Sequence, residues 1–196
     1  RLYFILRHVF FCLFMLRKMD DHVHKGCSCV SATASVHQTL DEMEWERGIW
    51  YAALTGDIDK IRSLIAKSND PSSVVKAPDN SGYTALHYAA RNGHYDVCKL
   101  LLSTGAHVDA LTRSGHATPL HKAAVTGRLD VLKLLLENKA CPTIQDSDGK
   151  TILHKAIENK QQAVVEFLLD KYPSLNDFKD HRQHGGDVTI YVGHFV

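Results

Sequence analysis

Residues 115–144, GHATPLHKAAVTGRLDVLKLLLENKACPTI, decide the fold of this chain. Thr118 followed by Pro119 is a helix start signal, because a Thr hydroxyl can cap the first turn and Pro lacks an N–H that this turn leaves unpaired. Gly127 then ends a short first helix, since glycine adopts the left-handed conformation at little cost. A second helix is predicted by an apolar stripe at i, i+3, i+4 spacing: Val131, Leu134 and Leu135. The stretch therefore predicts a helix-turn-helix unit.

The same pattern occurs once before and once after this stretch, as GYTALHYAARNGHYDVCKLLLSTGAHVDA from Gly82 and GKTILHKAIENKQQAVVEFLLDKYPSL from Gly149. His87, His121 and His154 follow one another at intervals of 34 and 33 residues. The apolar stripes also return in the flanking units: Val97, Leu100 and Leu101, then Val164, Phe167 and Leu168. Because no unit can bury its own stripe, we expect the units to stack.

The entry to each unit carries a family resemblance. TPLHKA at 118–123 matches the ankyrin signature T-P-L-H-x-A with its period of about 33 residues, while TALHYA at 84–89 and TILHKA at 151–156 each differ at one position. The chain thus resembles ankyrin repeats. The resemblance implies an all-α solenoid of stacked helix-turn-helix units joined by β-hairpin loops, and the turn signals NSG, RSG and DSDG between units agree with such hairpins.

The resemblance also predicts the domain organisation. Three repeats are expected at 79–113, 114–146 and 147–178. Residues 44–77 form a weaker unit with Trp50 at the His position, and we interpret it as a degenerate N-terminal capping repeat, since terminal repeats must turn one face to water. From about Cys27 to Arg182 the chain is similar to small family members with little beyond one repeat array. We expect residues 19–43 to be a disordered tail and residues 179–196 an irregular tail, where GGDVTIYVGHFV departs from the family pattern.

The first 18 residues, RLYFILRHVFFCLFMLRK, are apolar and basic. The apolar run at 2–16 is broken by Arg7 and His8 and is shorter than the roughly 20 residues of a spanning helix. No small-residue cleavage site follows it, as a signal peptide would require. Our preferred interpretation is that Met19 is the true start and that residues 1–18 are translated leader sequence; a real membrane segment and a fragment of a longer protein remain as alternatives.

Charge and cysteine content limit the classes of partner. The formal net charge is +1, but residues 1–18 hold four basic and no acidic groups, which leaves a net of −3 on the rest. This mildly acidic body argues against nucleic acid as a partner. The five cysteines are odd in number and irregularly spaced, so no disulfide framework is expected. A reducing compartment is therefore expected, either the cytoplasm or, as the alternative, the nucleus. Cys98 falls in a helical pattern and is expected to be a small buried hydrophobe.

Neither a metal centre nor a catalytic site is predicted. His87, His121 and His154 would lie on helices about 8–10 Å apart, too far to share a zinc ion with bonds of about 2 Å. A zinc site made by Cys27 and Cys29 with nearby histidines (His22, His24 and His37) is an alternative to the disordered tail. No phosphate-binding loop, nucleophile elbow or His-Glu-x-x-His motif occurs, so we expect no enzyme, no cofactor and no small-molecule substrate.

The predicted function is protein binding by a monomeric adaptor or scaffold. The resemblance implies a concave face whose variable positions are Ser81, Tyr83, Arg91, Arg113, His116, Val125, Ser147, Lys150 and Glu158. Tyr83 and Arg91 are the best anchor candidates, because Tyr and Arg are enriched at binding hot spots. Two other hypotheses stay open: a membrane-associated ankyrin protein anchored by residues 1–18, and a non-catalytic regulatory subunit of an enzyme complex.

Overall fold

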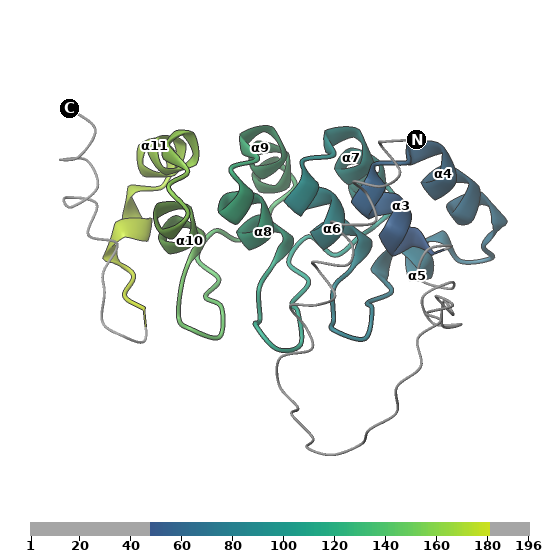
Figure 1. Ribbon diagram of the computed structural model, residues 1–196, viewed down its shortest axis with the longest axis horizontal. Coiled ribbons are helices and arrows are strands. Elements are labelled where there is room, and N and C mark those ends of the chain that lie inside the picture. The colour runs from purple at the N-terminus through teal and green to yellow at the C-terminus, as the bar shows by residue number, and fades with distance from the viewer. Residues whose placement is uncertain (1–47, 181–196) are drawn as a thin grey trace, which may run out of the picture. The chain divides into compact units, whose positions relative to one another are not determined.

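The computed structural model describes residues 48–180, which form four helix pairs followed by a short 3-10 helix (Figure 1). The first helices of the pairs are α3 (Ile49–Thr55), α6 (Ala85–Asn92), α8 (Pro119–Thr126) and α10 (Ile152–Glu158). The second helices are α4 (Ile58–Lys67), α7 (Tyr95–Ser103), α9 (Leu129–Glu137) and α11 (Gln162–Lys171). Helix α5 (Pro71–Lys76) lies between the first two pairs, and η1 (Pro173–Asp177) follows the last. The all-helical prediction is confirmed, and no β-strand is assigned in this part of the chain.

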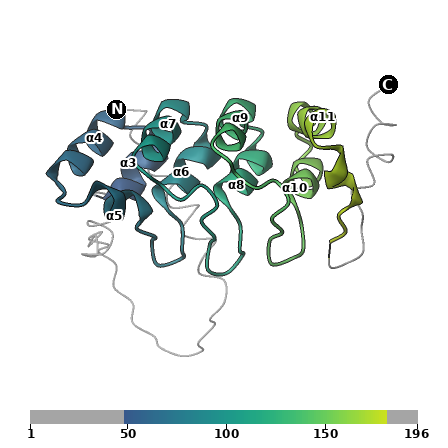
Figure 2. The ribbon, with the colours of Figure 1, turned by 180° about the vertical axis from the view of Figure 1, so that it is seen from behind.

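The helix pairs stack in two layers with loops on one side. The second helices form one layer, the first helices form the next, and the loops between units project beyond the first helices (Figures 1 and 2). Neighbouring first helices contact one another along the stack, from α3 to α6, α8 and α10. In residues 48–180 no helix is long and apolar enough to cross a membrane. The leader predicted at 1–18, the tail at 19–43, most of the 179–196 segment and the zinc alternative at Cys27 and Cys29 lie outside the described residues.

The apolar stripes of the second helices are buried between the units, as the pattern predicts. Leu101, Leu135 and Leu168 are completely buried. Cys98 is buried beside them, and burial raises the pKa of its thiol to about 12, which keeps it protonated and unreactive. Each stripe therefore packs on neighbouring helices, and the core runs through the whole stack instead of forming a separate centre in each unit.

The repeated histidines close the start of each first helix. In the first full repeat the backbone N–H of Thr84 donates to Nδ1 of His87 at 3.1 Å, and Nε2 of His87 lies 3.1 Å from the carbonyl oxygen of Ala117 in the next unit. A backbone N–H can only donate and a carbonyl can only accept, so the proton of the neutral ring is on Nε2. Burial is the main cause that lowers the pKa of His87 to about 4.

The next unit repeats this arrangement. The backbone N–H of Thr118 donates to Nδ1 of His121 at 3.3 Å, and Nε2 of His121 reaches the carbonyl oxygen of Lys150 at 3.2 Å. Burial again lowers the pKa of the ring. His87 and His121 therefore each join their own helix start to the following unit. At the start of α10, Nδ1 of His154 likewise accepts from the Thr151 N–H, at 3.3 Å.

The first helix pair has two features of its own. Trp50, at the His position, donates its indole N–H to the carbonyl oxygen of Ala77 at 2.9 Å. After α4 the chain forms α5, a helix additional to the two expected within 44–77. The Asp70 carboxylate accepts from the backbone N–H groups of Ser72 and Ser73, and Pro71 occupies the first turn, so an N-cap signal was present in the sequence.

Left-handed residues end the first helices. Gly93 and Gly127 have φ angles of 82° and 70°, as the pattern predicts. A Cβ at Gly127 would collide with Gln161, whose side chain donates to the carbonyl oxygen of Val125 at 3.3 Å. In the last unit Lys160 takes the glycine position with a φ of 55°. Glycine is therefore favoured at Gly93 and Gly127 for two reasons. It adopts the left-handed conformation, and it leaves room for a side chain of the next unit.

Candidate functional site

The projecting loops are joined to one another in a row. Each loop is closed by its own backbone bond, as between the N–H of Asp79 and the carbonyl of Tyr83 at 2.8 Å. Neighbouring loops are joined by bonds of 3.0 Å from Arg113 N–H to the Ser81 carbonyl and from Ser147 N–H to the Gly115 carbonyl. We call this row, loops 79–84, 112–118 and 146–151 with the exposed sides of α6, α8 and α10, the hairpin face. The predicted residues Ser81, Arg113 and Ser147 thus lie on one connected surface.

A carboxylate organises the first loop from its base. Oδ1 of Asp79 accepts from the backbone N–H groups of Ser81 and Tyr83, both at 2.8 Å, while Oδ2 accepts from the Tyr88 hydroxyl at 2.6 Å. Tyr88 is the residue directly after the structural His87. The carboxylate therefore holds the loop, and its two oxygens are hydrogen-bonded to three uncharged donors.

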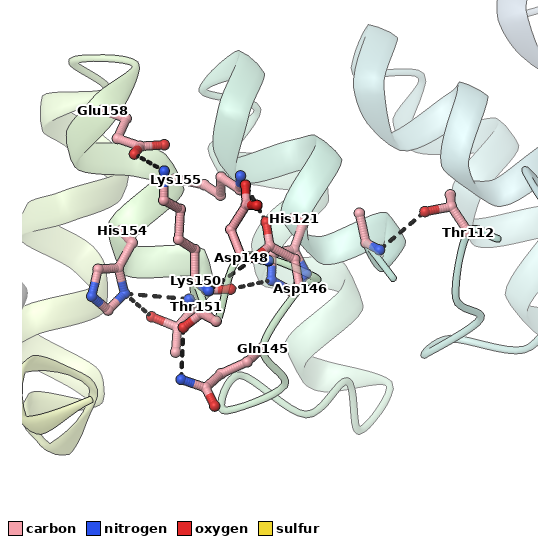
Figure 3. Close-up of polar contacts among 12 residues, drawn as sticks. Thr112, His121, Gln145, Asp146, Asp148, Lys150, Thr151, His154, Lys155 and Glu158 are labelled. Atoms are coloured by element: carbon pink, nitrogen blue, oxygen red, sulfur yellow. Dashed lines mark hydrogen bonds and ion pairs between the residues drawn. The ribbon is translucent and has the colours of Figure 1, made fainter. Parts of the chain in front are cut away.

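The third loop repeats this arrangement with an ion pair. Oδ1 of Asp146 accepts from the backbone N–H groups of Asp148 and Lys150 at 2.9 Å, and Oδ2 lies 2.7 Å from Nζ of Lys155 (Figure 3). Lys155 directly follows the structural His154. Burial by itself would raise the pKa of Asp146, but the hydrogen bonds from Lys155 and from the backbone outweigh it and hold the pKa below its usual value.

The second loop differs because Thr112 stands where the other two loops have Asp. Its hydroxyl accepts from the Ala117 N–H at 3.0 Å and closes the loop without a charge. Lys122, the residue after the structural His121, therefore has no carboxylate at the base of its own loop. It instead donates to the hydroxyl of Tyr83, in the preceding loop, at 2.9 Å. Among residues 48–180 no carboxylate forms an ion pair with Lys122.

The remaining predicted residues divide by exposure. Arg91, on the last turn of α6, is exposed, as are Arg113, His116, Ser147 and Glu158. Ser81, Tyr83, Val125 and Lys150 are half-buried. Lys150 and Glu158, both predicted to contact a partner, form an ion pair with each other (Figure 3). Tyr83 also packs against the core, with its ring 5.4 Å from that of His87 and 5.5 Å from that of Tyr88.

The second loop is one residue longer than the other two, since Thr118 follows Thr112 by six positions whereas Thr84 and Thr151 follow Asp79 and Asp146 by five. His116 has a φ of 45°, whereas Gly82 and Gly149 supply the left-handed residue in the other two loops, with φ of 83° and 75°. The insertion therefore moves the left-handed position from glycine to His116. This places an exposed imidazole in the second loop.

Sequence reasoning missed Lys122 and Lys155 on this face. A usable signal existed, because each of them lies three residues before a predicted face position, Val125 and Glu158 respectively. Residues three apart lie on the same side of a helix. Their partners could not be read from the sequence, since Asp146 meets Lys155 and Tyr83 meets Lys122 only through the tertiary fold. In the described part of the chain no group of three or more His, Cys, Asp or Glu side chains is placed to hold a metal.

The sequence of these repeats is similar to that of known proteins. The family model described as "Ankyrin repeats (3 copies)" matches residues 26–112 and 109–179. The chain belongs to the ankyrin-repeat family. The ankyrin resemblance inferred from the T-P-L-H-x-A motifs is therefore confirmed, together with the helical fold that it implies.

Similar ankyrin proteins include ankyrin repeat domain-containing protein 39 from Homo sapiens, 58% identical over 44% of this chain and 45% of the relative. The Bos taurus protein of the same name is 61% identical over 35% of this chain and 36% of the relative. The chain thus aligns with less than half the length of either relative. It is also 43% identical to palmitoyltransferase akr1 from Schizosaccharomyces pombe, over 69% of this chain and 21% of that protein.

Proposed function

We propose that this chain is a non-catalytic adaptor or scaffold that binds a partner protein across the hairpin face. The observation that carries the proposal is the continuity of that face. Backbone bonds join the three loops, so side chains from different repeats are held in one fixed row. Such preorganisation reduces the entropy lost on binding. Ankyrin repeats in general are protein-interaction modules, which supports the same conclusion.

The composition of the face supports a protein partner. Exposed Arg91 and half-buried Tyr83 are of the residue types enriched at binding hot spots, and Val125 adds an apolar contact that is not used by the core. The proposed location is the cytoplasm or nucleus, where the cysteines would stay reduced. Imaging of the tagged full chain tests the location, and enrichment at a membrane would favour the anchored alternative instead.

The binding proposal is tested by affinity purification of the full chain followed by quantitative mass spectrometry. The face variant combines Arg91→Ala with Val125→Ala, and the control variant combines Lys99→Ala with Glu137→Ala on the exposed side of the second helices. A true partner should be lost with the face variant and kept with the control. If these side chains are anchors, each truncation costs about 2 kcal/mol or more, roughly thirty-fold in affinity. A folded face variant that keeps every partner would place the interface elsewhere.

A second candidate is a non-catalytic subunit of an enzyme complex. It is favoured by the similarity to part of a protein named as a palmitoyltransferase. The two candidates differ in the partner that is recovered. An enzyme whose rate changes when the purified chain is added would support the subunit, whereas a partner without such a response would support the scaffold.

A further inference from the structure

The pair formed by Lys122 and Tyr83 has unused hydrogen-bonding capacity. The ammonium donates to the phenol oxygen at 2.9 Å, and Nζ lies 4.8 Å from the centre of the ring. An ammonium has three donors, and a phenol that accepts one of them keeps its own O–H to donate. Donors of both groups therefore remain side by side, on two repeats that the fold holds together.

Lys122 also lacks the ion pair that neighbouring lysines form within the described residues. Lys155 is paired with Asp146, and Lys150 with Glu158. Lys122 meets only the neutral hydroxyl of Tyr83, because Thr112 replaces the loop-base carboxylate. The nearby Asp79 is already occupied by three donors. The hairpin face thus presents a half-buried cation that has no ion-pair partner among the described residues.

We propose that Lys122 and Tyr83 together bind a carboxylate side chain, Asp or Glu, in an acidic segment of the partner protein. This inference rests on the proposed function, since it assigns the chemistry of one contact on the hairpin face. A carboxylate has two oxygens, so it accepts from the ammonium and from the phenol at once. Their mutual bond already holds the two donor groups next to each other.

The surroundings of the pair agree with an acidic segment and not a basic one. Exposed Arg91 on α6 and exposed Arg113 in the second loop add positive charge to the same face. Val125 lies three residues beyond Lys122 on α8 and offers a half-buried apolar surface. We therefore expect the bound segment to place an apolar residue next to its carboxylate. Complementary charge of this kind contributes chiefly to specificity and to the rate of association.

The test uses the full chain and a displayed library of random peptides. Peptides selected by the wild-type protein should share an Asp or Glu at one position. Lys122→Met keeps the aliphatic stem and removes the charge, so it should lower the affinity for those peptides by roughly tenfold or more. Tyr83→Phe removes only the hydroxyl and should lower this affinity less. Lys99→Met, an exposed lysine on α7, is the matched control and should bind as wild type does. Lys122→Glu should select peptides with Lys or Arg at the same position.

Two results would overturn the inference. One is the absence of any shared acidic position among the selected peptides, and the other is unchanged binding by a folded Lys122→Met. The double variant Arg91→Ala with Val125→Ala separates this failure from that of the proposed function. If it loses the peptides while Lys122→Met keeps them, the hairpin face still binds and only the carboxylate contact is refuted. If neither variant loses them, the hairpin face is refuted as well.

Discussion

The indole N–H of Trp50 donates to the carbonyl oxygen of Ala77 at 2.9 Å, and this bond takes the place of the one between His87 and Ala117 in the next unit. A tryptophan at the His position has no second ring nitrogen, so it does not accept from the start of its own helix as His87 does. It nevertheless keeps the donor that joins the first helix to the following segment. The degenerate first unit is thereby fastened to the stack through an indole.

We expect Trp50→Phe to destabilise the array by about 1 kcal/mol, because it removes this hydrogen bond and leaves a half-buried carbonyl without its partner. The free energy of unfolding from urea denaturation measures the effect. A change below about 0.5 kcal/mol would show that water replaces the indole at Ala77 without loss.

Stability should fall as the pH is lowered from 6.5 toward 4. Burial lowers the pKa of His87 from 6.5 to about 4, so in this window the unfolded chain binds a proton that the folded chain does not. The contribution of His87 is complete well above pH 6.5 and decreases by at most about 1.4 kcal/mol per pH unit below it. The pKa of His121 is lowered in the same direction and adds to the slope. Urea denaturation at neutral pH and at about pH 5 measures it.

The matched variant for this prediction is His87→Asn. It should be less stable than the wild type at neutral pH, because the link to Ala117 is lost, and its stability should depend less on pH. Equal slopes for the two proteins would mean that His87 is protonated in the folded state, in conflict with the bond from the Thr84 N–H to its Nδ1.

Glycine exchanges at equivalent positions should have opposite signs. Lys160→Gly relieves a left-handed lysine at an exposed site and should stabilise by about 0.5–1 kcal/mol. Gly127→Ala should destabilise by about 1–2 kcal/mol for the left-handed alanine alone. It also displaces Gln161, whose Oε1 would lie 2.1 Å from the new Cβ. Thermal and urea unfolding of both variants check the signs; equal signs would contradict the left-handed conformation of these two positions.

The register of the repeats is tested in the core. Leu135 on α9 is fully buried, and Leu135→Ala should cost about 2–5 kcal/mol. Leu111, directly before the second loop, is 50% exposed, and Leu111→Ala should change the free energy of unfolding by less than about 0.5 kcal/mol. A near-neutral Leu135→Ala would mean that the stripe at 131–135 does not lie between repeats.

Much of the array could be predicted because its signals are local and repeated. The N-cap at Thr118, the terminating Gly127 and the stripe ending at Leu135 each depend on residues within one unit. Helix α5 was not predicted, because it has no counterpart in the other units, although Asp70 and Pro71 are a helix start signal. The candidate site was only partly predicted: tip positions followed from the family pattern, while Lys122 and Lys155 did not.

The sequence by itself determined the repeat, its period and the buried side of each second helix, since these follow from spacing along one short segment. Only the tertiary structure decided which side chains meet across units. Lys122 reaches Tyr83, 39 residues earlier, because Thr112 supplies no carboxylate at the base of its own loop. Lys155 has such a carboxylate in Asp146 and is neutralised. Two lysines at the same position of the repeat thus differ in their partners, since Lys155 is ion-paired and Lys122 bonds a neutral hydroxyl. The residues around each lysine in the stack decide this difference, and its position on the helix does not.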